Sequence, residues 1–280
     1  MFASLKNYTL KGIYSKLTLF SIIAFCTIKS LLFWTPAENW KMIVLMDGNG
    51  YYSYLPATFI HHDYSFKFYT ERVKPEPVWF LVQSKGKQVN KYFIGEALVM
   101  TPFFLVSHGF SYLLENEHTG YSKVYFIGVL IAALFYLWMG LFFLRKLLLH
   151  YQLNDLWISF ILICFGIGSN LFYYSTQEPS MSHVYSFAFI SLFLFLVQQY
   201  THSKKRKFYF LSLFVLALII LIRPINGIIL LFAPFFFSDF KSFKLEFISI
   251  CKKVFKEITY YLLVFSPFLL QLIVWKIETG

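Results

Sequence analysis

Long apolar runs separated by short polar connectors dominate this chain. Seven runs are apolar enough to cross a bilayer as helices, because about 20 residues at about 1.5 Å each match a hydrocarbon layer of roughly 30 Å. These runs cover residues 17–35, 123–144, 156–175, 183–200, 208–222, 225–238 and 258–276. The pattern predicts an all-α fold, a polytopic transmembrane helix bundle with about seven spans.

One further apolar run, residues 94–114, carries Glu96, Pro102, Ser107 and His108. The positive-inside rule decides its placement, because basic residues near span ends favour the cytoplasm. If 94–114 does not cross, all basic clusters fall inside; if it crosses, every cluster after the first falls outside. These clusters are Lys6/Lys11/Lys16, Arg145/Lys146, Lys204/Lys205/Arg206/Lys207 and Lys241/Lys244/Lys252/Lys253/Lys256. We therefore expect an interfacial or re-entrant helix at 94–114 and a cytoplasmic N-terminus.

With this threading, segment 36–122 is a large first outer loop that bears interfacial helices. The loop at 175–183 and the turn at Arg223 face the same extracytoplasmic side, and the inner connectors are short and basic. We expect residues 1–280 to form a single membrane domain. It ends directly after a span, which fits the N-terminal part of a longer protein.

Composition supports an integral membrane protein. Hydrophobic residues make up 58% of the chain and charged residues 14%, against about 25% charged residues in soluble domains. The net charge is +11, but the cations gather between apolar runs, which indicates topology and membrane lipids as partners, and no nucleic acid. The three cysteines lack metal-ligand or disulfide-framework spacing and are interpreted as packing residues.

Asp47 is the first candidate for chemistry. It begins the turn-rich sequence Asp-Gly-Asn-Gly after an apolar stretch, so one interpretation is an Asx turn or a helix N-cap. The other is a catalytic base at the membrane surface, where partial desolvation raises the proton affinity of a carboxylate. The two roles are compatible. Tyr51 and Tyr52 follow closely and are interpreted as interfacial anchors and as candidates for substrate binding.

Further candidates stand at the other outer segments. Glu178 and His183 lie five positions apart across a proline-broken turn, which fits a solvated hairpin, a phosphate-linked divalent metal or a contact to a substrate hydroxyl. Arg223 precedes Pro224, where a guanidinium either recognises phosphate or snorkels from a helix end. Lys91 is a further phosphate candidate. The metal and any other cofactor stay undetermined.

Taken in order, these pieces resemble the GT-C superfamily of membrane glycosyltransferases, which includes protein mannosyltransferases and bacterial aminoarabinose-lipid A transferases. The resemblance rests on a first span, a long outer loop with an acid near its start, and a set of short motifs. The motifs are Asp47-Gly-Asn-Gly-Tyr-Tyr-Ser-Tyr-Leu-Pro-Ala, Lys91-Tyr-Phe-Ile-Gly, Thr101-Pro-Phe-Phe, Glu178-Pro-Ser-Met-Ser-His183 and Ile222-Arg-Pro. Many members have an Asp-Glu pair where this chain has Asp47-Gly48, so a second adjacent acid has no counterpart here.

The resemblance implies inverting transfer of a sugar from a polyprenyl-phosphate donor to a glycan, lipid or protein acceptor at the outer face. It makes Asp47 the catalytic base or a metal ligand. Arg223, with Lys91 or a metal at Glu178 and His183, would offset charge on the departing phosphate. Three alternatives stay open: a transporter or flippase of lipid-linked saccharides, which should carry ionisable residues near the bilayer midplane, a polysaccharide polymerase or ligase, and a structural membrane subunit.

Overall fold

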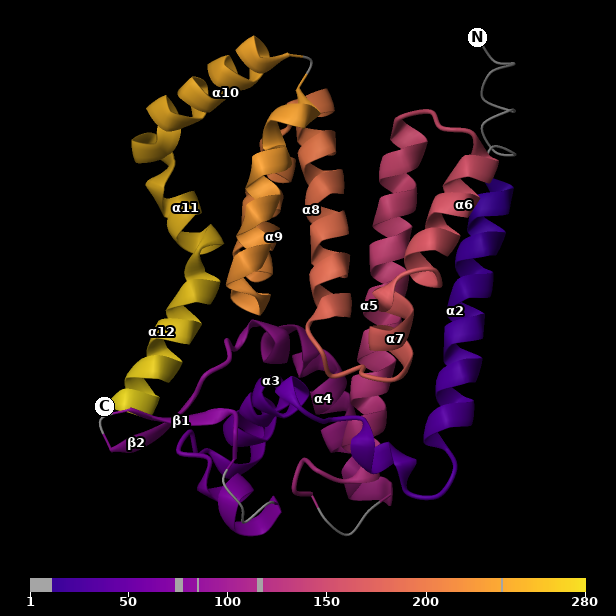
Figure 1. The fold of residues 1–280 in the computed structure, drawn as a ribbon. Helices are drawn as coiled ribbons and strands as arrows, with labels where there is room; N and C mark the ends of the chain where they lie inside the picture. The colour runs from indigo at the N-terminus through magenta and orange to yellow at the C-terminus, as the bar shows by residue number, and fades with distance from the viewer. Residues whose placement is uncertain (1–11, 74–77, 85, 115–117, 238) are drawn as a thin grey trace.

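The chain folds into a bundle of helices, which confirms the all-α class (Figure 1). The computed structural model describes residues 12–73, 78–84, 86–114, 118–237 and 239–280. Lys6 and Lys11 of the N-terminal basic cluster lie outside the described residues. The helices of the bundle are α2 (Ile13–Trp34), α4 (Gly95–Leu114), α5 (Lys123–His150), α6 (Asp155–Gly166), α7 (Asn170–Thr176), α8 (His183–Ser203) and α9 (Arg206–Ile222).

Four helices in the described part of the chain are long and apolar enough to cross a membrane, namely α2, α4, α5 and α8. Two bent helix pairs raise this number to as many as six, if each pair is one span. Helix α9, with 17 residues, and the 3-10 helix η4 (Pro224–Phe236) are not among these candidates. The helices thus fit an integral membrane protein, whereas the expected count of seven spans is not confirmed.

The expected span at 156–175 is broken into α6 and α7, which meet at an angle of 59°. Gly166 ends α6 close to α2, where a Cβ on this glycine would lie 2.8 Å from Ile22 Cγ2. Ser169 is the N-cap of α7, because its hydroxyl accepts a hydrogen bond from Leu171 N at 3.2 Å. The contact of Gly166 with α2 and the Ser169 N-cap therefore set the position where the helix breaks between α6 and α7.

Helix α5 has 28 residues and is about 42 Å long at the usual rise per residue. Helix α4 packs along its first half, as far as Tyr136, whose hydroxyl donates to Val99 O at 2.7 Å. Helix α8 packs along its second half, from Tyr136 against Tyr185 to His150 against His202. The two neighbours of α5 therefore lie at different levels along its length.

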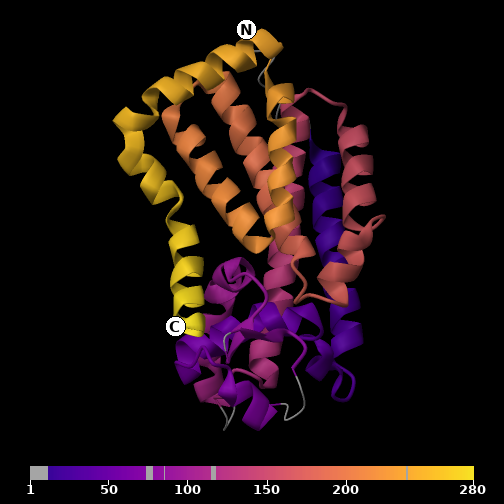
Figure 2. The ribbon, with the colours of Figure 1, turned by 60° about the vertical axis from the view of Figure 1, so that its left-hand side comes forward.

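Segment 36–122 gathers at one end of the bundle (Figures 1 and 2). Besides α4 it contains η1 (Asn39–Met42), α3 (Asp47–Pro56), η2 (Ala57–His61), η3 (Tyr69–Val73) and the antiparallel strands β1 (Leu81–Ser84) and β2 (Lys87–Asn90). The apolar pattern does not predict this hairpin. Tyr54 Oη donates to Tyr92 O at 2.8 Å, and Asn90 Nδ2 donates to Gly50 O at 2.7 Å. These bonds tie α3 to the chain around the hairpin.

The opposite end of the bundle carries α10 (Phe240–Lys253), which runs transverse to α8 and α9 (Figures 1 and 2). Asp239 caps α10 by accepting a hydrogen bond from Ser242 N at 2.7 Å. The chain then returns to the hairpin through η5 (Val254–Glu257), α11 (Ile258–Val264) and α12 (Ser266–Thr279). The expected span at 258–276 falls on α11 and α12. The helical stretch Phe240–Val264, which includes α10, meets α12 at a bend of 54°.

Candidate functional site

Polar side chains gather where the N-termini of α3, α4 and α8 meet the end of α9. We call this set the Asp47 cluster; its members are Asp47, Tyr51, Tyr92, Glu96, His183 and Arg223. Each member interacts electrostatically with at least one other. Helices α3 and α4, which carry Asp47, Tyr51 and Glu96, lie in the part of the bundle next to the hairpin (Figure 1). Because helix N-termini bear partial positive charge, this corner favours anionic groups.

Asp47 is the first residue of α3, and the backbone before it is strained. Met46 has φ 49° and ψ −127°, a conformation that is unfavourable for a residue other than glycine. Gly48 lies against the loop after α7, where a Cβ would stand 2.0 Å from Ser180 Oγ. Met46 occupies the N-cap position, and no side chain caps α3 among the described residues, so the N-cap interpretation of Asp47 is wrong. Its carboxylate interacts with the hydroxyl of Tyr92.

Two tyrosines flank the Asp47 carboxylate. The rings of Tyr51 and Tyr92 pack with centroids 4.6 Å apart. Burial, and then the neighbouring Asp47 carboxylate, raise the pKa of Tyr92, while burial and the charge of Glu96 raise the pKa of Tyr51 to about 12. Both phenols are therefore neutral near pH 7 and can donate hydrogen bonds.

Arg223 and His183 form the cationic side of the cluster. Arg223 Nη1 lies 3.2 Å from His183 Nε2, and the ring of Tyr174 stacks on the imidazole with centroids 3.7 Å apart. Since a guanidinium only donates hydrogen bonds, Nε2 must accept, which places the proton of a neutral His183 on Nδ1. Asn226 Nδ2 donates to Ser186 Oγ at 2.8 Å and holds the chain after Arg223 against α8.

Glu96 is wholly buried, and neither carboxyl oxygen has a hydrogen-bond partner in the described part of the chain. Burial raises the pKa of Glu96 well above its usual value; among the neighbouring charges, Arg223 lowers it and Asp47 raises it further. Gly95 explains this proximity, because a Cβ there would lie 2.3 Å from the Leu221 carbonyl carbon, so α4 begins directly against the backbone of α9. An unpaired buried carboxylate is costly. Its position beside a guanidinium therefore indicates that it serves the cluster.

Glu96 belongs to the cluster although the sequence analysis gave it no role. The available signal was a lone acid inside an apolar run, since ionisable residues in such segments are rare and are usually functional. Tyr92 was also missed, because a tyrosine within an aromatic-rich loop does not stand out by pattern. Among the predicted residues, the structure brings together Asp47, Tyr51, His183 and Arg223.

Three other predicted site residues, Tyr52, Lys91 and Glu178, lie outside the Asp47 cluster. Tyr52 is buried and its hydroxyl donates to Gly120 O, which is a packing role. Lys91 Nζ lies over the ring of Trp79, 4.1 Å from its centroid, and 5.4 Å from that of Tyr92, so it borders the cluster.

Glu178 accepts a hydrogen bond from Tyr173 Oη at 3.0 Å, while His183 pairs with Arg223. Glu178 and His183, which the sequence suggested as a pair of metal ligands, are thus hydrogen-bonded to different residues. The described residues contain no group of three or more His, Cys, Asp or Glu side chains suited to a metal ion.

A cavity of about 180 Å³ adjoins the start of α3. Its walls are mainly apolar and come from the end of α2, from η1 and from Met46, while Glu178 and Ser180 supply polar atoms. An apolar chain that is attached to a polar head would find both surfaces here.

The chain matches no protein-family model, no curated protein and no solved structure. Its function must therefore be argued from the cluster itself. The arrangement offers a carboxylate that can accept a proton, neutral phenols that can donate hydrogen bonds, and a guanidinium that can hold an anion.

We predict that Gly95→Ala destabilises the protein by about 1–3 kcal/mol, because the new Cβ would force α4 away from α9. Gly109→Ala is the matched control in the same helix, since a Cβ there meets nothing within 4 Å. This control should be neutral or slightly stabilising. Thermal unfolding of the purified variants in detergent measures the difference. Equal melting temperatures would contradict the backbone contact.

Proposed function

We propose that this protein is a membrane glycosyltransferase of the GT-C kind, which moves a sugar from a polyprenyl-phosphate donor to an acceptor hydroxyl. The observation that carries the proposal is the meeting of Asp47 and Arg223 in one cluster, although 176 positions separate them in the chain. A proton acceptor beside a phosphate-binding cation is what displacement at a sugar phosphate requires.

In the proposed reaction, the Asp47 carboxylate takes the proton of the acceptor hydroxyl. The acceptor oxygen forms a bond to the anomeric carbon of the sugar as the bond from that carbon to the phosphate oxygen breaks. The electron pair of the broken bond leaves with the polyprenyl phosphate, and a single displacement inverts the anomeric centre. Arg223 stabilises the charge on the phosphate. Tyr51 and Tyr92 donate hydrogen bonds to sugar or phosphate oxygens.

Glu96 and His183 position Arg223 in this proposal. His183 accepts a hydrogen bond from one guanidinium nitrogen, which leaves the other donors for phosphate oxygens. Glu96 is buried beside Arg223, where burial raises the pKa of the carboxyl group and the guanidinium acts in the opposite direction. Tyr174 stacks on the imidazole and restricts its rotation.

The proposed topology places the cluster at the outer membrane surface and keeps α4 out of the bilayer. The packing along α5 supports this placement. Helix α8 has 21 residues and is about 31 Å long, enough to cross the hydrocarbon layer by itself. Since α4 lies beside the other half of α5, a bilayer that is crossed by α8 leaves α4 largely beyond its surface. The basic connectors then face the cytoplasm.

The position of the charges favours an enzyme over a transporter or flippase. The cluster forms at the ends of α8 and α9, whereas transport sites lie near the bilayer midplane. The broken helix pair α6–α7 is the observation that favours a transporter. A polymerase or ligase would use the same lipid phosphate, and the acceptor distinguishes it in an assay. Incubation of the purified protein with a panel of polyprenyl-phosphate sugars tests the proposal through sugar release.

Asp47→Asn should reduce sugar transfer about 10²-fold or more, because the amide cannot accept a proton from the acceptor hydroxyl. Glu38→Gln is the control, since Glu38 lies in the same loop and its side chain is 72% exposed. Both variants should insert and unfold like the wild type. Transfer by Asp47→Asn at the wild-type rate would exclude Asp47 as the base.

Arg223→Ala should raise the donor KM about tenfold or more, the scale of a lost hydrogen bond to a charged group. Arg223→Lys should lie between this variant and the wild type, because lysine keeps the charge but loses the planar fork. The KM for the acceptor should stay unchanged in both. Steady-state kinetics with each substrate varied in turn provide the measurement, and unaltered donor kinetics in Arg223→Ala would assign Arg223 to anchoring a helix end.

Ser122→Cys should react with a membrane-impermeant maleimide from the outer side, because Ser122 directly precedes α5 at the end that carries the cluster. Lys205→Cys is the reference for the other side, since residue 205 is exposed between α8 and α9 at the opposite end of the bundle. It should react only after permeabilisation of the membrane. Reaction of Ser122→Cys only from the cytoplasm would invert the proposed topology.

A further inference from the structure

A groove separates α9 from α11 at the basic end of the bundle, and its cavity volume is about 650 Å³. Arg206 and Lys207 line it where α9 begins, and the remaining walls are apolar or aromatic. They include Phe210, Leu211, Phe214 and Leu263. Leu211 is 48% and Leu263 64% exposed, so the groove opens to the surroundings of the helices. Its chemistry is cationic at one end and apolar along its length.

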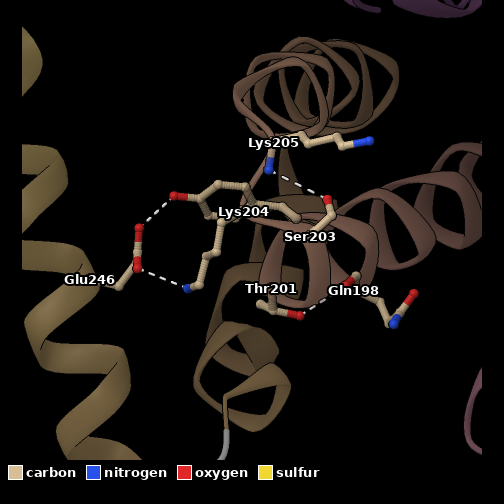
Figure 3. Close-up of polar contacts among 7 residues, drawn as sticks. Gln198, Thr201, Ser203, Lys204, Lys205 and Glu246 are labelled. Atoms are coloured by element: carbon tan, nitrogen blue, oxygen red, sulfur yellow. Dashed lines mark hydrogen bonds and ion pairs between the residues drawn. The ribbon is translucent and has the colours of Figure 1, made fainter.

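The basic residues beside this groove differ in whether a carboxylate neutralises them. Lys204 Nζ pairs with Glu246 at 2.9 Å, and Tyr200 Oη also donates to this carboxylate (Figure 3). Arg206 Nη2 pairs with Glu257 at 2.9 Å, which leaves further donors on the guanidinium. Lys207 has no carboxylate partner within the described ranges. The ammonium group of Lys207 lies 5.0 Å from the centroid of the Phe208 ring, so a positive charge without a carboxylate partner stands at the groove.

A second feature at the same end points to a lipid surface. Helix α10 has phenylalanines at a spacing of three and four residues, Phe240, Phe243 and Phe247, whose rings contact one another. Lysines occupy other positions of this helix. Such a helix lies in the headgroup region with its apolar face toward the acyl chains, and its transverse orientation fits that role (Figure 1). The basic end therefore lies at the level of lipid headgroups.

We propose that the groove binds an anionic membrane phospholipid. One acyl chain lies between α9 and α11, against Phe210, Leu211 and Leu263, and the headgroup phosphate contacts Lys207 and the free donors of Arg206. A groove with apolar walls in a bilayer is filled by hydrocarbon, and basic pockets at helix ends on one side of a membrane select acidic headgroups. This inference does not depend on the Asp47 cluster, because the groove lies where α9 begins and Arg223 of the cluster follows the end of α9.

Native mass spectrometry of the purified protein, titrated with phosphatidylglycerol or with phosphatidylcholine of the same acyl chains, tests the proposal. The wild type should retain phosphatidylglycerol more tightly. Lys207→Gln should weaken phosphatidylglycerol binding about five-fold, since a basic residue near an anionic headgroup contributes on the order of 1 kcal/mol. Lys205→Gln is the matched control, because the neighbouring Lys205 does not line the groove, and it should bind like the wild type.

A second variant tests the apolar part of the groove. Leu211→Trp places a larger ring in the cavity and should weaken the binding of both lipids, while Lys207→Gln affects only the anionic one. Equal losses in Lys205→Gln and Lys207→Gln would overturn the site, because they would show general attraction to positive charge. Equal retention of both lipids by the wild type, or unchanged binding in Leu211→Trp, would also overturn it.

Discussion

The backbone of α4 touches the backbone of α9 where Gly95 meets Leu221, and the candidate site depends on this contact. Each helix places an ionisable side chain directly beyond it, Glu96 on α4 and Arg223 after α9. A buried carboxylate without a hydrogen bond is unfavourable, and so is an unpaired cation close to hydrocarbon. The charge of Arg223 favours an ionised Glu96, but burial is the larger effect and raises the pKa of this carboxyl group. Such a pair stays available to bind and stabilise an incoming anion.

Hydrogen bonds from residues outside the Asp47 cluster fix the chain next to α3 and α4. Gln271 of α12 accepts a hydrogen bond from Ile94 N at 2.7 Å, one residue before Gly95. On the other side of the cluster, Asn90 donates to Gly50 O within α3. Segments far apart in sequence therefore fix the relative positions of α3, α4 and α9. A side chain that is anchored through its neighbours loses less entropy when a substrate binds.

The apolar pattern predicted α2, α5 and α8, because each is a continuous run of sufficient length. It also identified Asp47, His183 and Arg223 as candidates, since charged groups beside apolar runs are conspicuous. It did not predict that Met46 takes a positive φ and the N-cap position, because a tertiary contact of Gly48 sets that turn. The break between α6 and α7 and the residues around Glu96 could not be predicted for the same reason, since they too depend on tertiary contacts. Pattern gives the elements, whereas packing decides which side chains meet.

The two ends of the bundle have opposite chemistry, and this asymmetry links orientation to function. Lysines and Arg206 gather around α10, where anionic lipid headgroups would attract them with about 1 kcal/mol per cation. Carboxylates, phenols and a single guanidinium gather at the α3 end, where they are suited to a substrate with a polar head and an apolar tail. In the proposed topology, a basic end held at the inner surface would also hold the Asp47 cluster at the outer one, because a helix bundle is rigid on the scale of a bilayer. In this proposal the net charge of +11 acts on the placement of the site, while the proposed chemistry depends on the few ionisable groups within it.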